Sequence, residues 1–165
     1  FLYWYLRPSI RWPTLEFRAC DVCLAVDDTV GIAGLVRALA WTCAREAIDG
    51  APENPSRSEV MEAAMWRAGR YGLGGRLVSP TTMTTRPAGA VVGEMLAYVR
   101  DGLEFHGDWS EVSNLVASMM ASGDGAWRQR AAFARHQDPH DVIGYAIDAT
   151  FGAVGDLVAY PGPAW

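Results

Sequence analysis

Charged side chains that could take part in chemistry lie close together in the sequence near the start of the chain. Glu16 and Arg18 are two positions apart in the run Thr14–Arg18. If this run is a β-strand, both side chains lie on one face, because strand side chains alternate between faces. A carboxylate can bind Mg²⁺ through its oxygens, and a guanidinium can hold a phosphoryl group with its fork of donors. The pair therefore indicates a phosphate–metal site.

Two further arginines, Arg7 and Arg11, add positive charge on the same side of this segment. This face cannot be a dry core, because an unpaired buried charge costs too much free energy. A structural interpretation stays open, in which Glu16 and Arg18 form a salt bridge on an exposed sheet face.

The elements that must position these residues are two short strands followed by helices. Alternation predicts two strands within residues 1–18, with Leu15 and Phe17 facing the helices and packing on them. Prolines bracket the connection Pro8–Pro13. An isolated two-strand ribbon is marginal in water. We therefore expect a fragment, or a second chain that completes the sheet, and an exposed aromatic face formed by Tyr3, Tyr5 and Trp12.

Apolar residues at helical spacing predict a mainly helical remainder. The helices are expected from Asp27 or Asp28 to Gly50, from Ser56 or Ser58 to Gly72, and over about 88–106, 109–122, 126–136 and 138–152, with each Asp or Ser named here as a cap. The second helix is expected to be buried through the side chains of Met61, Met65 and Ala68. Residues 76–86 are predicted as an irregular hairpin or loop. The fold class is thus α+β.

Composition limits the class of protein. The chain has 165 residues and is 50% hydrophobic, which suits one domain over residues 1–155 with a loose tail at 156–165. The net charge is −5 and all 14 basic residues are arginine without a dense patch, so nucleic acid is not an expected partner. Three cysteines argue against a disulfide framework. No apolar run approaches a membrane span, and we expect a cytoplasmic protein.

Several other signals have ordinary structural explanations. Cys20 and Cys23 have CxxC spacing without a second ligand pair, and Pro139 separates His136 from His140. The run Gly72–Gly75 is interpreted as a helix stop and turn. Arg128, Arg130 and Arg135 are interpreted as a solvated helix face or a domain contact.

Arg67 and Arg70 leave two interpretations open. They lie three apart on one side of the second helix. They either pair with Glu59 or Glu62 or face a substrate cleft.

Four blocks of sequence, in order, resemble the type 2 glutamate–cysteine ligase (carboxylate–amine ligase) family. Trp4–Cys23 resembles the signature W-D-x-R-P-S-x-R-x-P-T-L-E-F-R-x-x-D-x-C. Trp66–Pro80 resembles W-R-A-x-R-Y-G-L-x-G-x-L-x-x-P. Gly107, Asp108, Glu111 and Val112 form the third block and Gly123–Arg135 the fourth. The resemblance covers about residues 1–150. Tyr5 stands where the family usually has Asp, which removes a charge from the polar face.

The resemblance implies that the chain is the C-terminal part of a glutamine synthetase-like catalytic domain and contains two antiparallel strands of its sheet. It implies that Glu16 is a metal ligand and that Arg18 and Arg11 are catalytic. It also implies a substrate- or nucleotide-binding set: Arg7, Arg11, Arg18, Arg67 and Arg70. The implied cofactors are ATP and Mg²⁺.

The implied reaction joins the side-chain carboxylate of glutamate to an amine, such as that of cysteine, through an acyl phosphate. The expected partners are these small molecules, the N-terminal half of the catalytic domain and a second copy in a homo-oligomer. The alternative is a non-catalytic helical interaction domain or subunit descended from such a ligase.

Overall fold

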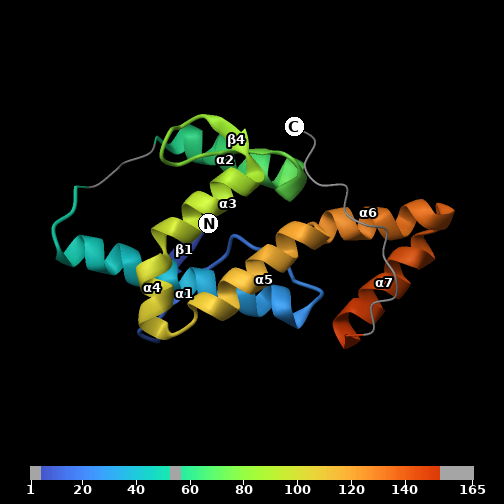
Figure 1. Cartoon of the computed structure of the whole chain (residues 1–165), viewed down its shortest axis with the longest axis horizontal. Helices are drawn as coiled ribbons and strands as arrows, with labels where there is room; N and C mark the ends of the chain where they lie inside the picture. Colours follow the sequence, from blue (N-terminus) through green and yellow to red (C-terminus); the bar gives the residue numbers. More distant parts are fainter. Residues whose placement is uncertain (1–4, 53–56, 153–165) are drawn as a thin grey trace.

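The computed structural model describes residues 5–52 and 57–152, which adopt an α+β fold (Figure 1). Strand β1 (Leu6–Pro8) pairs with β2 (Leu15–Phe17), and β3 (Arg76–Val78) pairs with β4 (Thr85–Pro87), both antiparallel. The helices are α1 (Val26–Ile48), α2 (Ser58–Tyr71), α3 (Ala88–Tyr98), α4 (Arg100–His106), α5 (Trp109–Ser122), α6 (Gly125–His136) and α7 (Pro139–Phe151), with a 3-10 turn η1 (Gly72–Gly74). The predicted fold class is confirmed, and residues 76–86 form a hairpin.

The main core lies where α1 packs against α4 and α5 (Figure 1). It consists of small and branched apolar residues that are nearly inaccessible to solvent: Leu35, Ala38, Val99, Leu103, Val112 and Val116. A second, smaller core joins α6 and α7 through Ala132, Tyr145 and Ala149, with Leu24 packed against it. Leu24 lies between β2 and α1, so this second core also holds the segment that follows the first hairpin.

Glycine allows α4 to approach α1 closely. A methyl group on Gly102 would lie 2.8 Å from the carbonyl oxygen of Ala38, which belongs to the α1 backbone. A backbone atom cannot move aside as a flexible side chain can. This contact also explains why the single helix expected over 88–106 is wrong. The chain leaves helical geometry at the buried Val99, with ψ near 5°, and α4 then packs on α1.

The helix starts differ from expectation at α1 and α2. Ala25 is the N-cap of α1 and makes no side-chain cap, while Asp27 and Asp28 lie in the first turn. Arg57 precedes α2, Ser58 is its first residue, and Ser56 lies outside the described residues. Helix α7 begins within the expected range 138–152, with Asp138 as its N-cap and Pro139 at the first helical position. The stop at Gly72 is also confirmed, since this residue has a φ of +56°.

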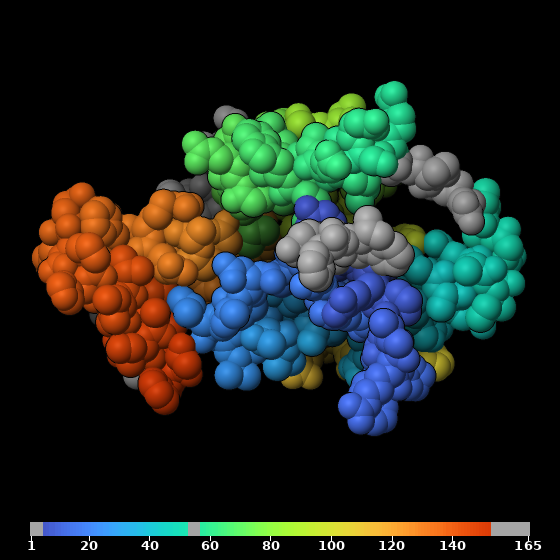
Figure 2. Space-filling view, turned by 180° about the vertical axis from the view of Figure 1, so that it is seen from behind, coloured from blue at the N-terminus to red at the C-terminus, as the bar shows by residue number. Residues whose placement is uncertain are grey.

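Two expectations about burial are wrong. Helix α2 has no fully buried residue, and Met61 and Trp66 are 50% and 64% exposed. Leu15 is 51% exposed and so does not pack into the helical core. The hairpin β1–β2 instead projects from the body, in the darkest blue of Figure 2. Tyr5 and Trp12 are exposed as expected, and Tyr3 lies outside the described residues.

Over the described ranges 5–52 and 57–152, no helix combines the length and apolar character that crossing a membrane requires.

Substituting Gly102 tests the close approach of α4 to α1. Gly102→Ala should lower the free energy of unfolding by about 1–3 kcal/mol, because the methyl group meets backbone that cannot yield. The matched control is Gly69→Ala in α2, where nothing lies within 4 Å of the added methyl group. This control should be neutral or slightly stabilising, since alanine favours helix. Chemical denaturation of both variants measures the difference, and equal stabilities would contradict the close contact.

The cap of α7 should make stability depend on pH. The backbone N–H of His140 donates to Asp138 Oδ1 at 2.9 Å, and the His140 ring lies 2.7 Å from the same oxygen. The backbone hydrogen bond, then the ring contact, hold the pKa of Asp138 below its ordinary value of 3.8. A lowered pKa gives stabilisation that is present above pH 3.8 and is lost as pH falls through the folded-state pKa.

Thermal melts between pH 2 and 6 test this cap with Asp138→Asn, which keeps a capping oxygen without a titrating charge. The melting temperature of the unmodified chain should exceed that of the variant above pH 4. The gap should close as pH falls, and a gap that stayed constant with pH would contradict the assignment.

Candidate functional site

The hairpin β1–β2 brings three predicted site residues together on one face. Arg7 lies directly opposite Glu16 in the antiparallel register. Arg7 Nε lies 2.5 Å from Glu16 Oε2, and Arg18 Nε lies 3.4 Å from Glu16 Oε1. Directly opposed residues share a face, and so do residues two apart on one strand. One carboxylate is thus held between two guanidinium groups, which confirms the predicted alternation at Glu16 and Arg18.

The cluster is open to solvent. The side chains of Arg7, Glu16 and Arg18 are 52%, 44% and 40% exposed. Exposed pairs of this kind contribute about 0–1 kcal/mol each. Two guanidiniums and one carboxylate leave one net positive charge, which would attract an anion such as a phosphate group. The arrangement therefore suits anion binding better than it suits stabilisation of the hairpin.

Tyr5 extends this face by one residue. The backbone N–H of Arg18 donates to the Tyr5 carbonyl at 2.7 Å, so the two residues lie opposite one another beyond the end of the strands. The Tyr5 side chain is 56% exposed. An aspartate at position 5 would place a carboxylate opposite Arg18, whereas tyrosine leaves Glu16 as the acidic group of the cluster.

The other predicted arginines lie elsewhere. Arg11 is in the connection between β1 and β2, and its guanidinium lies 5.3 Å from the centre of the Trp12 ring. Arg67 Nε donates to the carbonyl of Arg76 at 2.5 Å, and its guanidinium stacks 4.8 Å from the Tyr71 ring centre. Arg67 thus joins α2 to β3 rather than pairing with Glu59 or Glu62. Arg70 is exposed in the last turn of α2.

Glu16 is the one member of the cluster suited to a metal ion. Over residues 5–52 and 57–152, no group of three or more His, Cys, Asp or Glu side chains is close enough to hold one. Mg²⁺ commonly binds one or two carboxylates and fills its remaining positions with water and substrate phosphates. Glu16 therefore fits as a single ligand, and both its oxygens at present contact arginines.

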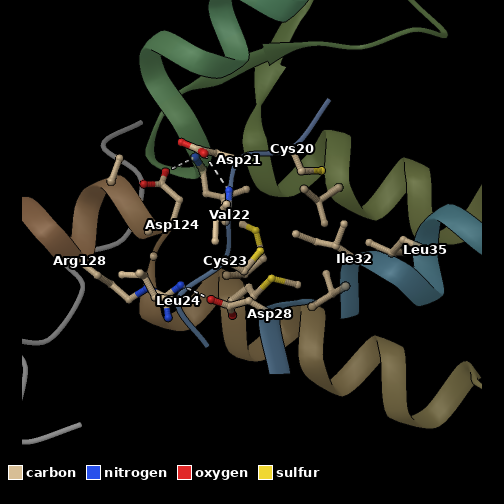
Figure 3. A pocket seen from close by; sticks show the side chains of 18 of the residues that line it. Cys20, Asp21, Val22, Cys23, Leu24, Asp28, Ile32, Leu35, Asp124 and Arg128 are labelled. Carbon is tan, nitrogen blue, oxygen red and sulfur yellow. Dashed lines mark hydrogen bonds and ion pairs between the residues drawn. The ribbon is translucent and has the colours of Figure 1, made fainter. Parts of the chain in front are cut away.

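A cavity of about 580 Å³ begins two residues after Arg18 (Figure 3). The segment Cys20–Leu24 forms one wall, and α1, α3, α5 and the start of α6 form the others. Cys20 and Cys23, which have CxxC spacing, are free thiols on this wall. The sequence pattern contained no signal for the cavity, because its walls come from segments that are far apart in the sequence.

A largely buried ion pair closes one end of the cavity. Arg128 Nη2 on α6 contacts Asp28 Oδ2 in the first turn of α1, and the two side chains are only 13% and 12% exposed (Figure 3). The interpretation of Arg128 as part of a solvated face is therefore wrong. Nothing in the sequence indicated this pair, since the partners are 100 residues apart.

Asp124, the N-cap of α6, joins the cavity wall to η1. Its Oδ1 accepts the backbone N–H of Trp127 at 2.7 Å, which caps α6, and its Oδ2 accepts the N–H of Leu73 at 2.9 Å. A side chain on Gly72 would collide with this carboxylate. Glycine at position 72 thus allows α2 to end there and allows the start of α6 to pack against η1.

The buried pair should carry much more stability than a surface pair on the same helix. Asp28→Asn should lower the free energy of unfolding by roughly 3–5 kcal/mol, because it leaves the Arg128 charge buried without a partner. The matched control is Asp49→Asn, whose ion pair with Arg45 is more than half exposed. The control should cost less than about 1 kcal/mol. Urea denaturation compares the free energies of unfolding of the two variants. Adding Arg128→Met to Asp28→Asn should recover stability, because it removes the unpaired charge. Equal losses in the two single variants would contradict this view.

The fold and the cluster define a class of protein with an Arg–Glu–Arg hairpin mounted on a helical body. The sequence model of the family described as "Glutamate-cysteine ligase family 2" matches residues 2–143 of this chain. The chain therefore belongs to the glutamate–cysteine ligase family 2, as the four sequence blocks indicated.

Similar curated proteins are named as candidate glutamate–cysteine ligases. The chain is 47% identical over 129 residues to one from Salinispora arenicola, covering 78% of this chain and 34% of the relative. It is 43% identical over 149 residues to one from Frankia alni, with coverages of 90% and 39%. It is 39% identical over 163 residues to one from Nocardia farcinica, with coverages of 99% and 41%. The chain thus spans 34–41% of the length of these relatives.

Proposed function

We propose that this chain forms part of an ATP-dependent carboxylate–amine ligase that joins the side-chain carboxylate of glutamate to an amine. The observation that carries the proposal is the exposed Arg7–Glu16–Arg18 face within a chain of the glutamate–cysteine ligase family 2. Because the chain spans only 34–41% of the length of the three relatives named above, the activity is proposed for a polypeptide that supplies the remaining part of the site.

The proposed reaction has two steps. The terminal phosphoryl group of ATP passes to the glutamate side-chain carboxylate, which gives an acyl phosphate and ADP. The amine nitrogen then attacks the acyl carbon, the bond from that carbon to the phosphate oxygen breaks, and the nitrogen loses one proton. The products are an amide and inorganic phosphate. Catalysis of such transfers depends mainly on positioning and on electrostatic stabilisation.

The roles of the cluster follow from its charges. Arg18 and Arg7 hold oxygens of the transferring phosphoryl group or the substrate carboxylate with paired N–H donors. Arg11, in the connection next to the strands, contributes a further positive charge to the nucleotide phosphates. Glu16 orients Arg7 and Arg18 and is available as one oxygen ligand for Mg²⁺, which would neutralise phosphate charge when bound. Arg67 has a structural contact in α2, and Arg70 is the more accessible of the two for a substrate.

The test uses a chimera in which this chain replaces the 149 residues that it matches in the Frankia alni relative. ATP- and glutamate-dependent phosphate release is measured beside thermal melts. Glu16→Gln should lower turnover by roughly 10²–10³, the usual effect of losing one preorganised electrostatic contact, with little change in melting temperature. Arg18→Lys should also lower turnover, because lysine lacks the two-pronged fork.

The matched control for this test is Glu59→Gln on exposed α2, which should leave turnover unchanged. A purely structural role for the cluster predicts the reverse pattern, with a lower melting temperature and unchanged turnover per folded molecule. Normal turnover in Glu16→Gln at saturating Mg²⁺ would overturn the assigned site.

A further inference from the structure

The cavity next to the hairpin is partly open to solvent and has the size of a small-molecule site. Its volume is about 580 Å³, within the range of roughly 300–1,000 Å³ that is usual for ligand pockets. Its walls come from α1, α3, α5, α6 and the segment Cys20–Leu24.

The lining is apolar and rich in sulfur. Aliphatic side chains and methionines make up much of it, among them Ile32, Leu35, Val116, Met95, Met119 and Met120. Methionine side chains adjust to irregular apolar shapes and make favourable contacts with aromatic rings. A ligand group that enters this cavity is therefore expected to be apolar, and an aromatic ring would suit it.

The charged groups in the wall are already paired. Asp28 binds Arg128, and both carboxylate oxygens of Asp124 accept backbone N–H groups. A cation buried beside these pairs would be unfavourable, because the Asp28 and Asp124 carboxylates already have partners and the buried Nε of Arg128, which has no hydrogen-bond partner among the described residues, is itself a donor. Asp21 differs, since it lies exposed among the cavity residues, and within residues 5–52 and 57–152 its side chain accepts only the adjacent N–H of Val22, at 2.8 Å. Its carboxylate can meet a cationic group at the rim.

The cavity lies close to the proposed phosphoryl-transfer cluster. Cys20 is two residues beyond Arg18, so their Cα atoms are no more than about 7 Å apart. A ligand seated in the cavity with its polar end at Asp21 would thus have that end next to the hairpin.

From this geometry we propose that the cavity binds the apolar side chain of the amine acceptor, and that this acceptor is a primary amine larger than cysteine. This inference rests on the proposed function and specifies its second substrate. The apolar part of the amine lies against Met119 and Ile32, and its nitrogen lies at the rim near Asp21. The short side chain of cysteine would leave most of the cavity unfilled.

Thiol protection tests the binding in the chain itself, with 2-phenylethylamine as the probe. Cys23 lines the cavity, whereas Cys43 lies on α1 outside it and serves as an internal control. The probe should slow alkylation of Cys23 by N-ethylmaleimide, measured by peptide mass spectrometry, and leave Cys43 unaffected. Ethylamine, which has almost no apolar part, should protect much less.

Two matched variants locate the effect. Ala126→Phe introduces a ring from an exposed helix position in the cavity wall, and should abolish the protection. Ala117→Phe places the same ring at an exposed position of α5 outside the wall, and should leave it intact. Protection that persists in Ala126→Phe, or no protection in the unmodified chain, would overturn the inference.

Turnover in the chimera separates this inference from the proposed function. Phosphate release with 2-phenylethylamine should show a KM that rises roughly tenfold or more in Ala126→Phe, the usual scale for an apolar pocket. Hydroxylamine has no apolar part, so its KM should rise much less than that of 2-phenylethylamine in Ala126→Phe, and Ala117→Phe should leave both KM values unchanged. Suppose that the chimera releases phosphate with hydroxylamine but prefers cysteine to 2-phenylethylamine. This result would overturn the inference and leave the proposed function standing. No release with any amine would overturn the function, and thiol protection would still decide whether the cavity binds the probe.

Discussion

The ion pair between Asp28 and Arg128 holds together the parts of the molecule that matter for function. It ties the first turn of α1 to α6 across 100 residues of sequence and is largely shielded from water. The segment from Cys20 to Ala25 enters α1 just before Asp28, so fixing this turn also fixes where the first hairpin leaves the body. Both the hairpin cluster and the cavity depend on that exit. Breaking the pair would leave a buried charge without a partner, which makes this arrangement hard to replace.

The protein uses arginine in two different environments. Arg128 is largely desolvated and contacts the Asp28 carboxylate through Nη2, while its buried Nε has no hydrogen-bond partner among the described residues, so its role is structural. Arg7 and Arg18 share a single carboxylate on an exposed hairpin, where ion pairs add little stability. The same side chain thus serves packing in one place and is available to an anion in the other. Burial, rather than residue type, separates the two roles.

Large apolar side chains are exposed on several of the described elements. Trp66 on α2 and Leu15 on β2 are more than half exposed, and α7 presents a stripe of Ile143, Ile147 and Phe151 at helical spacing. Exposed apolar patches usually mark interaction surfaces. We propose that these faces contact the remaining part of the catalytic domain, because the chain spans only 34–41% of the length of three relatives.

The sequence by itself determined the local features of this protein. Alternation placed Glu16 and Arg18 on one face, Asp138 and Pro139 marked the start of α7, and Gly72 marked the end of α2. Each of these depends on neighbours within a few residues, where strand periodicity, capping and glycine conformation act directly. The family likewise followed from short blocks in order. Tertiary structure alone decided the break at Val99, the burial of Arg128, the exposure of Leu15 and the cavity next to the hairpin. These depend on which distant segments pack together, and a linear pattern does not specify the distance between residues such as Asp28 and Arg128.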